Sequence, residues 1–160
     1  LPEAQRDRFM ARISMGYPSR GAEVAMLDSH GAHNPLETLQ PVTDATTVLA
    51  AIEAIRHIYA SPAVRQYVVD IAAATRSTAA LRLGASPRAA LHLLRAARAY
   101  SALEDRDYVL PDDVKTVAGD VLAHRLLPSS ETQLARRSTR DVVAELLVRV
   151  PVPAGVDARS

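Results

Sequence analysis

Prolines at three places mark where helices can begin, and they divide the second half of the chain into segments. Pro62, Pro87 and Pro111 each precede a stretch with helical spacing of apolar residues. Proline suits the first position of a helix because it needs no backbone N–H there and its φ angle is already set. Ser61 and Ser86 stand directly before two of these prolines and can cap the N–H groups of the first turn. The sequence therefore predicts helices starting at residues 62, 87 and 111.

Apolar residues follow these starts at three- and four-residue intervals, the pattern of a helix face that packs on a core. A last helix is expected from a cap near Ser138, with Asp141 as its capping-box partner, until Pro151 ends it. One Phe, five Tyr and no Trp leave small and unbranched residues dominant, which favours packed helices over a sheet. The fold class expected is mainly α. The residues expected on buried faces are Val64, Tyr67, Val68, Ile71, Ala72, Leu93, Ala97, Tyr100, Val114, Val117, Ala118, Val121, Leu122, Val143, Leu146, Leu147 and Val150.

Arg88 lies in the first turn of the predicted helix 87–103, where its charge is unfavourable. A helix N-terminus carries partial positive charge and unpaired N–H donors, so a cation there costs a little stability. One interpretation is that this helix end and Arg88 together face an anion such as a nucleotide phosphate. The other is a solvated arginine that tolerates its position. These residues alone leave both open.

The opening residues predict structure that is completed elsewhere. Residues 1–10 read as a polar turn or short helix, and the stretch from Arg12 to Met15 alternates in the manner of a β-strand. A lone strand cannot satisfy its own backbone hydrogen bonds, so its sheet is expected outside the printed sequence. The chain also begins without Met, and we expect it to be a piece of a longer protein.

Between these parts we expect a helix over residues 20–29 with Ser19 as its cap, a loop over 30–41, and a helix over 43–59. His30 and His33 in the loop are interpreted as solvated rather than metal-binding, because no carboxylate cluster accompanies them. Residues 75–85 are expected to form a polar-to-mixed connection, 127–137 to be irregular and polar, and 154–160 to be disordered. His124, at the end of the helix from residue 111, is interpreted as a partner of the helix dipole rather than a catalyst.

Charge and composition exclude several functional classes. The formal net charge is +1, from 19 basic and 18 acidic residues, so no bulk attraction to nucleic acid or a membrane is expected. Arg88, His92, Arg95 and Arg98 are interpreted as a solvated or partner-facing stripe rather than a nucleic-acid surface. The chain has no cysteine, which excludes disulfides and zinc–thiolate sites, and no apolar run of membrane-spanning length. A cytoplasmic protein is expected.

Five phrases occur along the chain in a recognisable order and spacing. They are Leu1-Pro2-Glu3-Ala4-Gln5-Arg6-Asp7-Arg8-Phe9, Gly16-Tyr17-Pro18, Gly84-Ala85-Ser86-Pro87-Arg88-Ala89, Tyr108-Val109-Leu110-Pro111-Asp112-Asp113-Val114 and His124-Arg125-Leu126. In this combination the chain resembles the C-terminal part of the MoxR family of AAA+ ATPases, from residue 1 to about residue 126.

The resemblance implies an AAA+ helical lid domain, which is a helical bundle, preceded by a short stub of the α/β ATPase core. Residues 1–18 would be the end of the core, with the arginine-finger segment and the last strand. Residues 19–150 would form the lid, and 151–160 a disordered tail. The family also implies a homo-oligomeric ring, expected to be a hexamer, with a chaperone-like role toward client protein complexes.

The same resemblance implies roles for individual residues. Arg88 corresponds to sensor 2, which reaches the nucleotide phosphates with Ser86 and Pro87 beside it. Arg8 corresponds to the arginine finger, which acts in trans on the neighbouring subunit. Position 6 is usually apolar in this phrase, whereas here it is Arg6, so the choice between Arg6 and Arg8 is open.

The nucleotide implied is ATP, with Mg²⁺ held by the missing core. The printed sequence has neither a Gly-rich loop ending in Gly-Lys-Ser/Thr nor a strand ending in a Walker B acidic pair. The chain alone is therefore expected not to hydrolyse ATP, and we assign no metal ligand within it.

Two other interpretations stay open. One is the lid of a different AAA+ clade, chelatase-like or helicase-loader-like, which the upstream core sequence would distinguish. The other is a stand-alone helical module that binds protein or DNA. A DNA-binding module would use the arginine stripe, and its binding would depend on salt.

Overall fold

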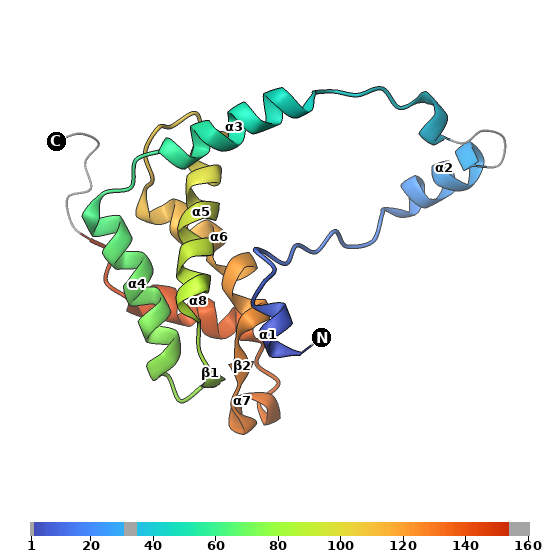
Figure 1. Cartoon of the computed structure of the whole chain (residues 1–160). Helices are drawn as coiled ribbons and strands as arrows, with labels where there is room; N and C mark the ends of the chain where they lie inside the picture. Colours follow the sequence, from blue (N-terminus) through green and yellow to red (C-terminus); the bar gives the residue numbers. More distant parts are fainter. Residues whose placement is uncertain (1, 31–34, 154–160) are drawn as a thin grey trace. The chain divides into compact units, whose positions relative to one another are not determined.

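Helices make up most of the chain (Figure 1), as the apolar spacing predicts. The computed structural model describes residues 2–30 and 35–153. The disordered tail predicted for residues 154–160 lies outside these residues. The elements are α1 (Glu3–Arg6), α2 (Arg20–His30), the 3₁₀ turn η1 (Pro35–Thr38), α3 (Ala45–His57), α4 (Pro62–Ser77), β1 (Leu81–Leu83), α5 (Pro87–Leu103), α6 (Pro111–Leu122), the 3₁₀ turn η2 (Ala123–Arg125), β2 (Leu127–Pro128), α7 (Ser130–Leu134) and α8 (Thr139–Arg149).

The chain divides into two compact units, and the first contains both ends of the described sequence. It is formed by residues 1–12 together with residues 53–160. The second unit runs from Ile13 to Ile52 and contains α2, η1 and the first part of α3. In the second unit Ser19 Oγ accepts a hydrogen bond from the Ala22 N–H at 3.3 Å, so the predicted cap of α2 is confirmed. The described side chains of this unit are exposed.

The predicted helix starts in the first unit are confirmed. Ser61 Oγ accepts from the Val64 N–H at 3.2 Å, and Ser138 forms a capping box with Asp141. Pro62, Pro87 and Pro111 begin α4, α5 and α6, as the sequence predicts. Each of these starts uses only neighbouring residues, so the local sequence is sufficient to define it.

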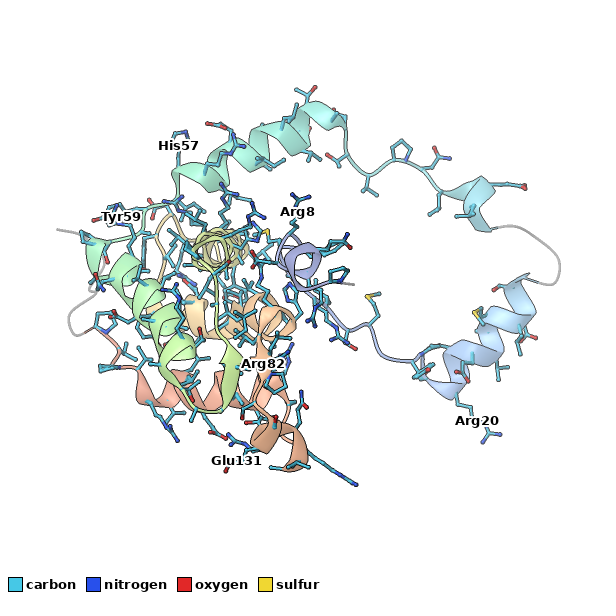
Figure 2. All side chains as sticks on the ribbon, turned by 60° about the horizontal axis from the view of Figure 1, so that its bottom comes forward. Arg8, Arg20, His57, Tyr59, Arg82 and Glu131 are labelled. Carbon is cyan, nitrogen blue, oxygen red and sulfur yellow. The ribbon has the colours of Figure 1, made fainter. Side chains whose placement is uncertain are left out.

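The core of the first unit lies between α4, α5, α6 and α8. Helix α5 packs against α4 and α6, and α8 packs against α4 and α6. Their side chains crowd into the space between the helices (Figure 2). The predicted buried faces are confirmed, except that Tyr100, Val117 and Leu147 are half-buried. The largest fully buried side chains include Tyr67, Ile71, Leu93 and Leu122.

Two connections of this unit are fastened to each other by backbone hydrogen bonds. The Tyr59 N–H donates to Asp107 O and the Val109 N–H donates to Tyr59 O, each at 2.9 Å. An isolated parallel bridge thus joins the α3–α4 connection to the α5–α6 connection. Beside it, the Arg106 guanidinium forms two hydrogen bonds of 2.6 and 2.7 Å to the buried carboxylate of Asp113.

One prediction of local structure is wrong, and another stays a prediction. Residues 11–19 contain neither helix nor strand, but the sheet that would complete a strand from Arg12 to Met15 is expected outside the printed sequence, so that strand stays a prediction. The segment 127–137 is not irregular, because its strand β2 pairs antiparallel with β1 in the connection 75–85. Ser129 then caps the short helix α7. A pairing between two short segments so far apart leaves no periodic signal in either sequence.

Gly84 occupies a position that has no room for a side chain, and Gly84→Ala is expected to destabilise the protein. A Cβ atom there would lie 2.6 Å from Thr75 O and 2.7 Å from Arg76 Cα. These are backbone atoms of α4, so the helix itself would have to shift, at a cost of about 1–3 kcal/mol. The expected result is a melting temperature lower by roughly 2–4 °C for each kcal/mol lost. Thermal unfolding followed by circular dichroism measures it.

The matched control for this prediction is Gly21→Ala in α2. A Cβ at Gly21 meets nothing within 4 Å, and alanine favours a helix over glycine by about 0.5–1 kcal/mol. The control variant should be as stable as the parent or slightly more so. Equal melting temperatures for Gly84→Ala and the parent would contradict the steric argument.

Candidate functional site

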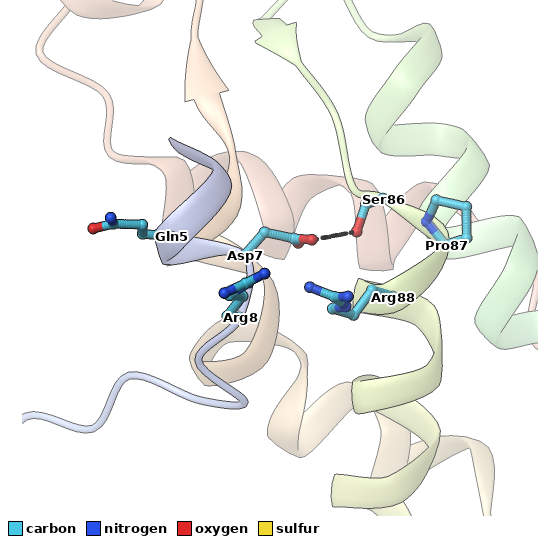
Figure 3. Close-up of a pocket in the computed structure, with 6 residues that line it drawn as sticks. All are labelled: Gln5, Asp7, Arg8, Ser86, Pro87 and Arg88. Carbon is cyan, nitrogen blue, oxygen red and sulfur yellow. Dashed lines mark hydrogen bonds between the residues drawn. The ribbon is translucent and has the colours of Figure 1, made fainter. Parts of the chain in front are cut away.

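An open hollow of about 620 Å³ lies between the segment after α1 and the start of α5. Its lining comes from two parts of the sequence that belong to the same compact unit. Figure 3 shows the side chains of Arg8 and Arg88 on the two sides of this hollow and Gln5 turned away from it. The lining residues are Gln5, Asp7, Arg8, Ser86, Pro87 and Arg88. This volume is in the range of small-molecule sites.

The start of α5 is held in place by α4 on one side and by its own cap on the other. The Ala85 N–H donates to the buried Thr75 Oγ1 at 2.8 Å, and Arg76 Nε donates to Ala85 O at 2.8 Å. Ser86 Oγ then accepts from the Ala89 N–H at 3.2 Å, which confirms the predicted cap. The first turn of α5 therefore projects into the hollow from a fixed connection.

Two cations line the hollow together with the carboxylate of Asp7, which is paired with Arg125 instead. Arg8 and Arg88 are both exposed, and neither guanidinium has a hydrogen-bond or ion-pair partner among the residues that the structure describes. The N-terminus of α5 adds its own partial positive charge beside Arg88. An anion with several oxygen acceptors, such as a phosphate, fits this arrangement of donors and charge. Arg6, by contrast, is half-buried and does not line the hollow.

Asp7 connects the two sides of the hollow. Its carboxylate accepts hydrogen bonds from Ser86 Oγ at 2.9 and 3.0 Å, so the residue beside Arg8 holds the cap residue beside Arg88. On its other side Asp7 accepts from Arg125, which is only 4% exposed. Asp7 therefore fixes the spacing of the two arginine-bearing segments.

The chain is similar to known proteins over almost all of its length. The AAA lid domain family matches residues 73–146. The chain is 36% identical to the uncharacterised protein YeaC of Bacillus subtilis, with 96% of this chain and 48% of that protein aligned. It is 35% identical to chaperone MoxR1 of Mycobacterium tuberculosis, covering 96% of this chain and 42% of that protein, and 32% identical to protein MoxR of Paracoccus denitrificans, covering 96% and 51%. The chain belongs to the MoxR family of AAA+ ATPases.

A solved structure shows that this MoxR-family chain has the fold of part of a known protein. The crystal structure of a proposed ATPase from Cytophaga hutchinsonii superposes with a TM-score of 0.86 at 33% identity, over 96% of this chain and 49% of that one. The chain thus spans about half the length of the curated relatives it matches. The expected mainly α lid fold is confirmed.

The family match contains only one side of the hollow. Ser86, Pro87 and Arg88 fall within the matched residues 73–146, whereas Asp7 and Arg8 precede them. The structure brings together all the residues predicted for the site, although the two groups are separated by about half the chain. Their roles toward a nucleotide are treated below as a proposal.

The predicted basic stripe on α5 is not one continuous solvated face. His92 Nδ1 lies 2.6 Å from Arg125 Nη2, inside the unit, and the Arg98 Nε is buried. Only Arg88 and Arg95 are exposed. A surface that binds nucleic acid needs accessible cations, and these helix residues do not form such a row.

His124 and Arg125 have different roles at the end of α6. His124 Nδ1 lies 3.1 Å from Asp120 O in the last turn of α6, a carbonyl that also accepts from the Arg12 N–H at 2.9 Å, which confirms the predicted interaction with the helix end. The importance of Arg125 was missed by the sequence analysis. Its main partner, Asp7, lies 118 residues away, and no local pattern signals a pair so distant in sequence.

No candidate metal site or membrane helix is found in the described part of the chain. Residues 2–30 and 35–153 contain no cluster of three or more His, Asp or Glu side chains placed to hold a metal ion. His33 lies outside these residues, and the His30 side chain is not described. No helix among them is both long and apolar enough to cross a bilayer.

His92 makes the stability of the protein depend on pH. Burial and the nearby charge of Arg125 lower the pKa of His92 from its ordinary 6.5, Arg95 and Arg88 act in the same direction, and Asp7 opposes them. Below pH 6.5 the unfolded chain therefore binds more protons at this residue than the native state does. The free energy of unfolding should fall as the pH decreases through this range, and this group should have no effect above it.

The variant His92→Gln is expected to remove this part of the pH dependence. Urea unfolding between about pH 7.5 and about pH 5.5 measures it, as the difference in slope between the variant and the parent. His57→Gln, at an exposed histidine of α3 that contacts Glu53, is the comparison variant outside the core. Identical slopes for His92→Gln and the parent would contradict the prediction.

Proposed function

We propose that this chain is the C-terminal half of a MoxR-type AAA+ ATPase in which Arg8 and Arg88 contact the phosphates of one bound ATP. The observation that carries the proposal is the shared hollow: two unpaired guanidinium groups and a helix N-terminus face the same space. In this assignment Arg88 is sensor 2, Arg8 is the arginine finger, and Ser86 and Pro87 set the start of α5. Residues 1–18 are the end of the core and residues 19–150 the lid.

The chemistry of phosphoryl transfer explains why two arginines belong here. Negative charge accumulates on the transferred phosphoryl group, so catalysis depends on positioning and on charge stabilisation. ATP supplies the reacting phosphate when it is bound, and the upstream core holds Mg²⁺. A guanidinium group presents a planar pair of donors that matches two phosphate oxygens, which a lysine does not.

The shared hollow restricts how the arginines act within a ring. If Arg8 reaches the nucleotide of a neighbouring subunit, Arg88 of the same chain reaches that nucleotide too, because Asp7 holds their segments together. The ring, expected to be a hexamer, the client protein complexes and the cytoplasmic location remain parts of this proposal. Kinship with a protein named chaperone MoxR1 supports the chaperone-like role, and the match to the AAA lid domain family supports a ring.

A mixing experiment tests whether the two arginines of one chain serve one site. Full-length Arg8→Ala and Arg88→Ala subunits are assembled together, and phosphate release is compared with each variant alone. Each site in the mixture then lacks one arginine if a single chain supplies both, so activity should stay at the mean of the two variants. A rise toward parental activity would mean that Arg8 and Arg88 reach a nucleotide from different subunits, and the shared-site proposal would fail.

The 160-residue chain alone is proposed to be inactive, because its sequence holds neither a phosphate-binding loop nor a Walker B acidic pair. Phosphate release at high chain concentration measures this. Sustained turnover by the purified chain would show that the assignment of the missing half is wrong.

A further inference from the structure

Arg125 is a buried charge whose hydrogen-bonding capacity is fully used. It is 4% exposed, at the end of η2, and a guanidinium group buried without partners would be costly. Its Nε donates to Val121 O at 2.8 Å, which ties the side chain to its own helix end. The two terminal nitrogens point away from α6 and reach two other segments of the unit.

The first of these segments is the one that carries Arg8. Nη1 of Arg125 donates to Asp7 O at 2.7 Å and to Asp7 Oδ1 at 3.0 Å. Nη2 donates to Met10 O at 3.1 Å and also to Phe9 O. Arg125 therefore binds the carbonyl groups on both sides of Arg8, and His124 Nε2 also lies 3.0 Å from Phe9 O. Residues 7–10 lie in neither helix nor strand, so these side-chain contacts hold the segment together with the turn hydrogen bonds donated by the Arg8 and Phe9 N–H groups.

The second segment is α5, and Arg125 reaches it by two routes. One is direct, through His92 Nδ1 at 2.6 Å from Nη2. The other passes through Asp7, whose carboxylate also accepts from Ser86 Oγ, and Ser86 caps the helix on which Arg88 stands. The lowered pKa of His92 is consistent with a neutral ring that accepts from the guanidinium.

We propose that Arg125 and Asp7 are a positioning pair that locks the Arg8 segment onto the start of α5, so that Arg8 and Arg88 move as one rigid unit. Neither member of the pair needs to touch the nucleotide. The positioning itself is a property of this chain, whereas its effect on catalysis rests on the proposed function. A shift of a catalytic group by about 1 Å can lower the reaction rate by about 10²-fold. Loss of the positioning pair is therefore expected to lower the rate of ATP hydrolysis even though Arg8 and Arg88 are still present.

The lock can be measured without nucleotide in the 160-residue chain, which contains no cysteine. Spin labels are attached to Gln5→Cys and Leu91→Cys, two exposed positions on the two segments, and the distance distribution is recorded by pulsed electron paramagnetic resonance. Asp7→Asn and Arg125→Met are each expected to replace a single narrow distribution with a broad one. Asp7→Asn loses the charge at the surface of the unit and leaves the core residues intact.

Arg106→Met is the matched control, because it breaks another partly buried ion pair, with Asp113, away from the two labelled segments. It should lower the melting temperature and leave the distance distribution narrow. If Arg125→Met does not fold, Asp7→Asn decides the question. A distribution that stays narrow in folded Asp7→Asn would overturn the proposal.

Kinetics of the full-length protein separate this inference from the proposed function. Arg125→Met should lower kcat by about 10²-fold in the parent, but by little in an Arg8→Ala, Arg88→Ala background, since it acts through those residues. An equal loss in both backgrounds would overturn the positioning role. If Arg8→Ala and Arg88→Ala leave turnover unchanged while the labelled distance still broadens, the lock stands and the nucleotide role of the arginines fails.

Discussion

Arg8→Ala in the full-length protein is expected to lower kcat for ATP hydrolysis by a factor of about 10³ to 10⁵. This is the contribution that arginine fingers make to kcat in related phosphoryl transfers. The loss should be in kcat more than in KM, because the guanidinium stabilises charge that develops in the transition state. The fold should be intact, since the exposed Arg8 side chain contacts no other described residue through a hydrogen bond or ion pair. Steady-state phosphate release measures the effect.

Arg6→Ala is the matched control for this prediction and also answers which arginine of the phrase acts. Arg6 is half-buried and does not line the hollow, so its removal should change kcat by no more than a few-fold. A large loss for Arg6→Ala with little loss for Arg8→Ala would transfer the proposed role to Arg6.

Action in trans has its own test with the Arg8→Ala variant. These subunits are mixed with subunits whose own nucleotide site is disabled by a substitution in the core. Each partner then supplies what the other lacks, and the mixture should be more active than either variant alone. If the mixture gains no activity, Arg8 acts within its own subunit.

Arg88→Ala is expected to lower ATP turnover at least about tenfold without loss of stability. An arginine in the first turn of α5 opposes the helix dipole, so its removal should leave the protein equally stable or more stable by about 0.3–1 kcal/mol. A fall in activity together with an unchanged or higher melting temperature identifies a functional residue rather than a structural one. Arg88→Lys should recover only part of the activity, because lysine lacks the planar fork.

Arg95→Ala on the same helix is the control for Arg88. It is exposed, lies about two turns further along α5 and does not line the hollow. Turnover and melting temperature should both match the parent. Unchanged turnover in Arg88→Ala would remove the sensor assignment.

Local signals in the sequence were sufficient for the helical part of the fold. The starts of α4 and α5 could be predicted because the serine cap and the following proline act on the first turn alone. The buried face of α4 could be predicted because its apolar residues repeat with the helical period. The resemblance to the MoxR family implied a role toward a nucleotide for each of Arg8 and Arg88, whereas their position on one hollow of the same chain was not predicted from the sequence.

Features that depend on distant partners could not be predicted. The pairing of β1 with β2 rests on hydrogen bonds between segments that are each only two or three residues long. The strand predicted from Arg12 to Met15 needs a sheet that is expected outside the printed sequence, so it stays a prediction. The role of Arg125 could not be predicted either, because its carboxylate partner Asp7 lies near the other end of the sequence.

The bridge between Tyr59 and Tyr108 has a mechanical consequence for the first unit. The Tyr59 backbone both donates to and accepts from the α5–α6 connection, so a displacement of the chain just before α4 is shared with the turn that precedes α6. A force that pulls on the C-terminal end of α3 would thus act on both α4 and α6 rather than on α4 alone. The amide hydrogens of Tyr59 and Val109 lie in connections, but they should exchange with deuterium as slowly as those of a helix interior. Faster exchange would show that these two backbone hydrogen bonds are broken.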